Sequence, residues 1–151
     1  MSNTTQARPE RLIDARGPRY TAAIATVVLS AALVTESNLI IGFQFVVFLS
    51  AVLFGLRRSL YGCIYRNLIQ PRLTGAVPSE NEAAPRFAQL VGALFAASAL
   101  FGGLTGNITI FLIATSFALG AAFLNAAFGF CLGCKFYIIL LRAKSRIKSI
   151  N

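Results

Sequence analysis

The chain has 151 residues, of which 56% are hydrophobic and only 13% are charged, about half the charged share of an ordinary soluble domain. It contains no His, which excludes Ser-His-Asp and Cys-His catalysis and His-ligated zinc or haem. The 14 Lys and Arg outnumber the 5 Asp and Glu, but they gather in three blocks between apolar stretches. That placement is typical of a membrane protein and not of one that binds nucleic acid.

Residues 1–19 combine arginines with acidic residues and contain no apolar run. A signal peptide needs such a run, so we expect a cytoplasmic leader here. Two apolar stretches follow at 20–35 and 39–56, and each is close to the roughly 20 residues of a spanning helix. Only Glu36-Ser37-Asn38 separates them, which predicts an antiparallel helical hairpin.

The central segment has two parts of different character. Over 57–70 the apolar residues recur at helical spacing, which predicts an amphipathic helix at the membrane interface. The predicted apolar face consists of Leu60, Tyr61, Ile64, Tyr65, Leu68 and Ile69. Residues 71–85 contain Gly, Pro, Ser and Glu without an apolar period, so we predict a solvated linker.

The second half of the chain repeats the pattern of the first. Apolar stretches at 87–104 and 108–130 are joined by Thr105-Gly106-Asn107, and we predict a second hairpin. Residues 142–151 form a basic cytoplasmic tail that we expect at the anionic inner surface of the membrane. The predicted fold is all-α: a four-transmembrane-helix bundle within residues 20–141, built from two tandem helical hairpins in parallel orientation.

The placement of charge predicts the orientation of the bundle. All 14 Lys and Arg lie before the first span, in the central segment or after the fourth span, and neither hairpin tip holds one. Under the positive-inside rule, both termini and the central segment are then cytoplasmic. Gln44, Gln89 and Asn125 lie within the spans and are predicted to pack against neighbouring helices, where their amides can find partners.

Short segments of the two halves correspond to each other. Pro18-Arg19-Tyr20 before the first span matches Pro85-Arg86-Phe87 before the third, and Gly62-Cys63 matches Gly133-Cys134. Because each half leaves the cytoplasm and returns to it, such copies would be related by an axis along the membrane normal. The repeat predicts equivalent cytoplasmic positions for Cys63 and Cys134.

The conspicuous chemical motif is Cys131-Leu132-Gly133-Cys134, where the fourth span meets the cytoplasm. Two thiols at this spacing can close a small disulfide, bind a soft metal ion, or act as attacking and resolving sulfurs in exchange. Lys135 favours a thiolate, whereas the negative end of the fourth helix opposes it, unless Gly129 or Gly133 breaks that helix. The alternative interpretation is that Cys131 and Cys134 are small apolar residues at a crowded helix end.

A metal site would need more ligands than this pair supplies. Structural zinc takes four ligands, and the chain has three cysteines and no His. Metal binding would require Cys63, a partner chain, or Cu(I), which a thiolate pair can hold. The repeat predicts that Cys63, Cys131 and Cys134 can cluster on the cytoplasmic side. We predict no cofactor and leave a metal open.

Four segments of the chain carry a family resemblance. They are Ile13-Asp14-Ala15-Arg16-Gly17-Pro18-Arg19, Phe54-Gly55-Leu56-Arg57-Arg58-Ser59, Pro85-Arg86-Phe87-Ala88-Gln89 and Ala126-Ala127-Phe128-Gly129-Phe130-Cys131-Leu132-Gly133-Cys134. Together they resemble a bacterial integral-membrane family of unknown function, over roughly residues 12 to 142. The resemblance implies a small four-span protein of the bacterial inner membrane whose Cys-x-Gly-Cys signature falls on Cys131, Gly133 and Cys134. The family pattern has an acidic residue after the second Cys, where this chain has Lys135.

Three functions are compatible with the pair and the bundle. In the first, Cys131 and Cys134, with Cys63 as a third thiol, exchange electrons or sulfur with a cytoplasmic thioredoxin-like or sulfurtransferase partner. In the second, the bundle transports a soft metal ion or a small sulfur compound, and the pair is its inner handover site. In the third, the chain is a structural subunit of a membrane complex or a homo-oligomer, and the cysteines are incidental. The sequence does not decide whether the chain is an enzyme.

Overall fold

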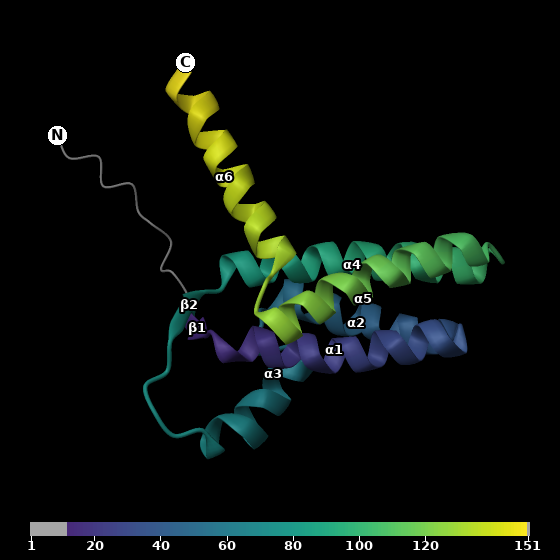
Figure 1. The fold of residues 1–151 in the computed structure, drawn as a ribbon, viewed down its shortest axis with the longest axis horizontal. Coiled ribbons are helices and arrows are strands. Elements are labelled where there is room, and N and C mark those ends of the chain that lie inside the picture. Colours follow the sequence, from purple (N-terminus) through teal and green to yellow (C-terminus); the bar gives the residue numbers. More distant parts are fainter. Residues whose placement is uncertain (1–11, 151) are drawn as a thin grey trace.

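The two halves of the chain follow the same order of elements, a short strand and then three helices. A computed structural model describes residues 12–150 (Figure 1). The first half contains β1 (Leu12–Asp14), α1 (Arg16–Thr35), α2 (Asn38–Phe54) and α3 (Leu60–Ile64), and α3 continues into a π-helical turn, η1 (Tyr65–Ile69), and a 3-10 turn, η2 (Gln70–Arg72). The second half contains β2 (Ser79–Asn81), α4 (Ala83–Leu104), α5 (Ile108–Phe128) and α6 (Leu132–Ile150).

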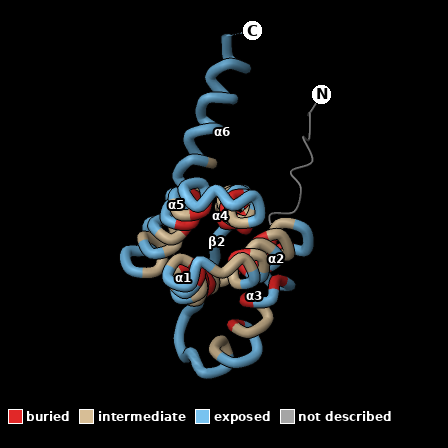
Figure 2. The backbone as a smooth tube through the Cα atoms, turned by 90° about the vertical axis from the view of Figure 1, so that its right-hand side faces the viewer, coloured by how far each residue is buried: buried red, intermediate tan, exposed pale blue. Residues whose placement is uncertain are grey.

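Four helices run lengthwise beside one another and enclose the core. Figure 2 looks along them, with α1 and α2 on one side and α4 and α5 on the other; α1 packs along α5, and α2 along α4. Leu29, Ile41 and Phe111 are fully buried between them. Small residues such as Ala96 and Ala99 are also fully buried, and such residues let neighbouring helices approach closely.

Three of these helices, α1, α4 and α5, are long and apolar enough to cross a membrane. Their outward faces carry exposed large apolar side chains, among them Val27, Leu94 and Phe117, as expected for helices surrounded by lipid. The fourth, α2, is apolar but shorter, with 17 residues. The predicted all-α class is confirmed, and the chain is a multi-pass membrane protein.

A short ladder between β1 and β2 joins the two halves at one end of the bundle (Figure 1). The strands are antiparallel, with Ile13 opposite Glu80, and the backbone N–H of Ala15 donates to the carbonyl of Pro78 at 2.9 Å. The predicted leader and linker therefore differ from the structure, since residues 12–19 and 79–85 form strands and helix starts. Residues 1–11 of the leader lie outside the described residues. A three-residue ladder is too short to show the period-two pattern of a strand.

The same local device starts the first helix of each half. The Asp14 side chain accepts a hydrogen bond from the backbone N–H of Arg16 at 2.9 Å, and the Asn81 side chain accepts one from Ala83 at 2.9 Å. Short Asx side chains satisfy free N–H groups at a helix start in this way. As a result, α1 and α4 begin four residues before the apolar stretches predicted from hydropathy.

The central helix is attached to the bundle through two tyrosines. The Tyr61 hydroxyl donates to Oε1 of Gln44 at 2.8 Å, and the Tyr65 hydroxyl donates to Oδ2 of Asp14 at 2.7 Å. The predicted helix over 57–70 is found from residue 60 to residue 72, but Leu60 and Leu68 of its predicted apolar face are exposed. Fewer residues of this segment are therefore buried than the apolar face predicted from the sequence contains.

Candidate functional site

The chain breaks sharply between α5 and α6, just before the cysteine pair. Gly129 caps α5 with a left-handed backbone, φ 66°, and its N–H donates to the carbonyl of Asn125 at 3.0 Å. Only Gly adopts this conformation without a steric penalty. The span predicted to reach Phe130 therefore ends at Phe128, and the pair begins a new helix.

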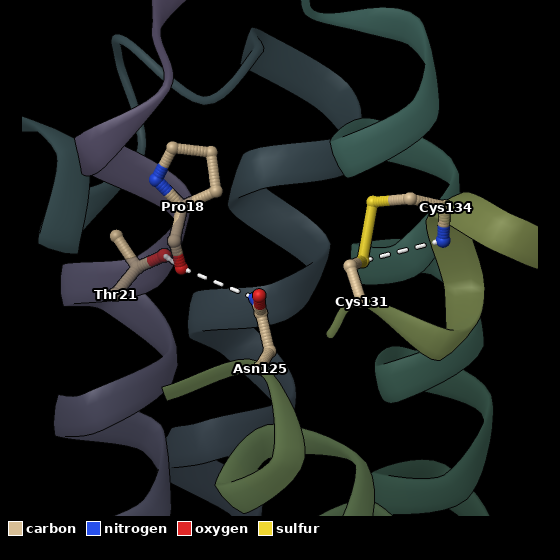
Figure 3. The surroundings of a disulfide bond; sticks show 5 residues. All are labelled: Pro18, Thr21, Asn125, Cys131 and Cys134. Carbon is tan, nitrogen blue, oxygen red and sulfur yellow. Dashed lines mark hydrogen bonds between the residues drawn. A yellow bond between two sulfur atoms is a disulfide. The ribbon is translucent and has the colours of Figure 1, made fainter. Parts of the chain in front are cut away.

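Cys131 and Cys134 are joined in a disulfide at the N-terminus of α6 (Figure 3). Their Cα atoms are 5.2 Å apart, and both residues are half-buried. Cys131 precedes the first residue of α6, and its Sγ accepts a hydrogen bond from the backbone N–H of Cys134 at 3.2 Å. The positive end of α6 thus faces the sulfur of Cys131, so the dipole expected to oppose a thiolate favours one here.

Gly133 fixes the start of α6 against α4. A Cβ at this position would lie 2.6 Å from both the Cα and the Cβ of Ala88. Because carbon atoms in contact need about 3.5–4.0 Å, only Gly lets the two backbones approach so closely. Gly133 lies within α6 and does not break a helix; the break predicted for this region is at Gly129 alone.

Lys135 follows the pair and packs on a neighbouring ring. Its Nζ lies 5.2 Å from the centroid of the Phe130 ring, within the range of a cation–π contact. The side chain is exposed. The contact places the positive charge of Lys135 over Phe130.

Cys63 is far from the pair in the fold. It lies on α3, which leaves the α1 and α2 side of the bundle, whereas α6 leaves the opposite side (Figure 2). Its thiol donates to the carbonyl of Arg57 at 3.8 Å. Over residues 12–150, no group of three or more His, Cys, Asp or Glu side chains is arranged to hold a metal ion. The repeat left open whether Cys63 joins the pair; in the fold the two lie on opposite sides of the bundle, since α3 and α6 leave it on opposite sides.

A cavity of about 420 Å³ lies beside the pair, and Cys131 forms part of its wall. It is open on one side, where the wall residues Phe117 and Phe136 are exposed. The wall is mostly Phe and Ala from α1, α2, α4, α5 and the start of α6, with few polar side chains. Gln89 and Asn125, which were predicted to pack against neighbouring helices, line it together with Thr21. The Asn125 amide also donates to the carbonyl of Pro18 at 3.5 Å (Figure 3).

Sequence reasoning missed this cavity because its wall comes from five separate elements. A single apolar stretch does not show which of its faces borders a void and which packs tightly. The pattern that was available is the row of Phe and Ala in the fourth span, but the same residues also serve ordinary helix packing. The placement of Cys131 beside the cavity therefore required the fold.

Gln44, the third amide predicted to pack between helices, does not line the cavity. Gln44 is fully buried, and its Oε1 accepts from Tyr61 as described above. Its Nε2 has no hydrogen-bond partner within the described part of the chain. Gln44 thus attaches α3 to α2, consistent with the predicted packing role.

Comparison with known proteins places the chain in a family. A family model described as a domain of unknown function, DUF4395, matches residues 13–142. No curated protein and no solved structure matches the chain. The match includes the bundle, the cysteine pair and the ladder strands except Leu12, and the resemblance to a family of unknown function is confirmed. This chain belongs to the DUF4395 family.

Proposed function

We propose that this protein is a membrane-embedded thiol–disulfide exchange protein whose reactive groups are Cys131 and Cys134. The observation that carries the proposal is the hydrogen bond from the Cys134 N–H to the Sγ of Cys131 at the start of α6. A sulfur in this position is a good leaving group when the disulfide is attacked, since the helix N-terminus stabilises the thiolate.

The proposed step is an exchange with a cytoplasmic dithiol partner. A thiolate of the partner attacks the Sγ of Cys134, the Cys131–Cys134 bond breaks, and Cys131 leaves as a thiolate. The second partner thiol then attacks the partner sulfur bonded to Cys134, and Cys134 leaves as a thiolate. The partner ends as a disulfide, and the pair ends as a dithiol after Cys131 and Cys134 take up the two protons. A thioredoxin-like protein supplies such a dithiol, and a sulfurtransferase would instead deliver a sulfur atom.

We further infer that α2 is a fourth span and that the bundle consists of two tandem hairpins in parallel orientation. With 17 residues, α2 is at the short end of the range for spanning helices, about 17–25 residues. The β1–β2 ladder supports a common orientation, because it joins the segments that lead into α1 and α4. Both hairpins then start from the same end of the bundle.

The location that fits best is the bacterial inner membrane, with both termini and the pair on the cytoplasmic side. The basic residues support this orientation, since they lie outside the hairpin tips. The segment predicted as a basic tail belongs to α6, whose exposed Phe136, Ile139, Leu140 and Ile147 recur at helical spacing beside basic residues. A helix of this kind lies on an anionic lipid surface.

The proposal is tested by trapping the exchange intermediate. Oxidised protein carrying Cys63→Ser is mixed with a thioredoxin variant that keeps only one of its two active-site cysteines. The residue that forms the mixed disulfide is identified by mass spectrometry. We expect a mixed disulfide on Cys134, because Cys131 is the better leaving group. The double variant Cys131→Ser, Cys134→Ser is the matched control and should give no conjugate.

Other outcomes have distinct meanings. A conjugate on Cys131 alone contradicts the assigned roles of the two sulfurs. A gain of one sulfur atom on the pair, when a sulfurtransferase replaces thioredoxin, identifies sulfur transfer in place of electron transfer. If neither thioredoxin nor a small dithiol opens the disulfide, the exchange function is wrong and the cysteines are incidental to a structural subunit.

A further inference from the structure

We propose that the cavity beside Cys131 binds a lipid-soluble quinone, which reoxidises the pair. This inference rests on the proposed exchange function and names the second substrate of the same site. The cavity, at about 420 Å³, falls within the range of about 300–1,000 Å³ that is typical of small-molecule sites. The composition of the wall, the spanning helices that form it and the sulfur of Cys131 at its edge favour a quinone as the ligand.

The wall has the composition of a site for a flat apolar ring. Five of its residues are phenylalanines, Phe48, Phe87, Phe95, Phe117 and Phe136. The rings of Phe95 and Phe117 are stacked, with centroids 5.8 Å apart. Aromatic surfaces of this kind favour a planar, unsaturated ligand in offset stacking.

The few polar side chains in the wall suit the carbonyl groups of a quinone. Gln89 and Asn125 both line the cavity, and each side-chain amide has two N–H donors. The Asn125 amide uses one donor on the carbonyl of Pro18 in a long hydrogen bond of 3.5 Å, so another remains. A ligand with carbonyl acceptors and a flat apolar body therefore fits better than a saturated acyl chain.

The cavity lies among the helices that cross the membrane, which favours a ligand that arrives from the lipid bilayer. Its walls belong to the spanning helices α1, α4 and α5 and to the apolar α2. Most wall residues lie toward the end of the bundle that holds the β1–β2 ladder and the start of α6, and Phe95 and Phe117 lie near the middle of α4 and α5. A lipid-soluble oxidant reaches such a site from the bilayer without crossing water.

The two sulfurs then have different neighbours. Cys131 lines the cavity and Cys134 does not. In the reduced protein the Cys131 thiolate adds to the quinone ring and forms a sulfur–carbon bond. Cys134 then attacks the Sγ of Cys131, the sulfur–carbon bond breaks, and the disulfide forms. The quinone leaves as a quinol with two electrons from the thiols and two protons, so the exchange balances.

The test separates binding from electron transfer. Purified protein in nanodiscs is titrated with 2-methyl-1,4-naphthoquinone in the oxidised state, and binding is measured. The protein is next reduced, freed of reductant, and mixed with the same quinone while quinol formation and thiol loss are followed. We expect saturable binding, and one quinol formed for each pair of thiols lost.

Two variants and one control locate the site. Ala122→Leu fills the cavity and should weaken quinone binding by roughly tenfold or more; Gln89→Leu removes an amide while keeping the volume and should weaken binding by roughly fivefold. Ala127→Leu adds the same volume as the first variant on an exposed position of the same helix and should bind as wild type does.

Each contrary result is informative. If the pair cycles with small dithiols and disulfides but quinone neither binds nor oxidises it, the quinone site is wrong and the exchange function stands. If quinone binds without oxidising the thiols, the electron transfer is wrong. If Ala127→Leu weakens binding as strongly as Ala122→Leu, or if a tightly held phospholipid is not displaced by quinone, the cavity is not the quinone site. If no dithiol opens the disulfide, the exchange function is wrong, whatever the quinone binding experiment shows.

Discussion

Cys131 combines two roles at one atom, since its sulfur caps α6 and forms half of the disulfide. The corresponding helix in the first half of the chain, α3, has the same kind of cap without a cysteine. There Ser59 precedes α3, and its Oγ accepts a hydrogen bond from the N–H of Gly62 at 3.1 Å. The Sγ of Cys131 accepts from Cys134 at 3.2 Å in the same arrangement. Because a hydroxyl serves this cap equally well, Cys131→Ser should remove the sulfur while keeping the start of α6.

Tyr65 gives a prediction about alkaline pH. Burial, aided by the hydrogen bond to Asp14, raises the pKa of Tyr65 from 10.0 to about 12. Above pH 10 the unfolded chain releases this proton while the folded chain keeps it, so the stability contributed by Tyr65 is fully present below pH 10 and is lost as the pH rises through about 12. The melting temperature of Tyr65→Phe should therefore fall less than that of wild type between about pH 9 and about pH 11.

The measurement is a thermal melt in detergent at both pH values. Burial likewise raises the pKa of Tyr61 to about 12, so the variant should lose only part of the alkaline drop. Tyr137→Phe on α6 is the control and should show the full wild-type drop. An equal drop in Tyr65→Phe and wild type would contradict the account of this tyrosine.

At the scale of elements, the contact between α6 and α4 holds the cysteine pair at the bundle. Gly133→Ala places a methyl group 2.6 Å from the backbone of Ala88, so α6 must move away from α4. We expect a loss of about 1–3 kcal/mol in the free energy of unfolding and faster opening of the disulfide by a small dithiol. Thermal melts and alkylation kinetics measure the two effects.

Gly120→Ala is the matched control for this substitution. Gly120 lies within α5, and an added Cβ there would meet nothing within 4 Å. Ala is the better helix former by about 1 kcal/mol, so this variant should be as stable as wild type or more so. If Gly133→Ala is equally harmless, the close approach to Ala88 does not hold the pair in place.

Hydropathy predicted the four long helices to within a few residues, because apolar length is decided by the membrane itself. It placed the starts of α1 and α4 four residues late, since hydrogen bonds to the Asp14 and Asn81 side chains begin these helices in polar sequence. It assigned no helix to residues 131–141 and only a basic tail to 142–151, although Phe136, Ile139 and Leu140 already show helical spacing. The β1–β2 ladder had no detectable signal, as it pairs segments 67 residues apart through three residues each.

At the scale of the whole molecule, the candidate site exists only through the arrangement of both halves. The sequence identified Cys131 and Cys134 from their spacing alone. It did not show that they begin a helix, because Gly129 is compatible both with one continuous helix and with two helices separated by a break. It also did not place Cys63 relative to the pair, since equivalence between halves does not say on which side of the bundle each copy lies.

The proposed function requires that Cys131 and Cys134 form a reversible dithiol centre. The most direct measurement is a redox titration of the purified protein, in which accessible thiols are counted by the mass added on alkylation. We expect one thiol, Cys63, in the oxidised protein and three in the reduced protein, with a reversible transition between them. Cys131→Ser and Cys134→Ser should each abolish the transition. A pair that stays unreactive at every potential, or a transition that survives either substitution, would contradict the claim.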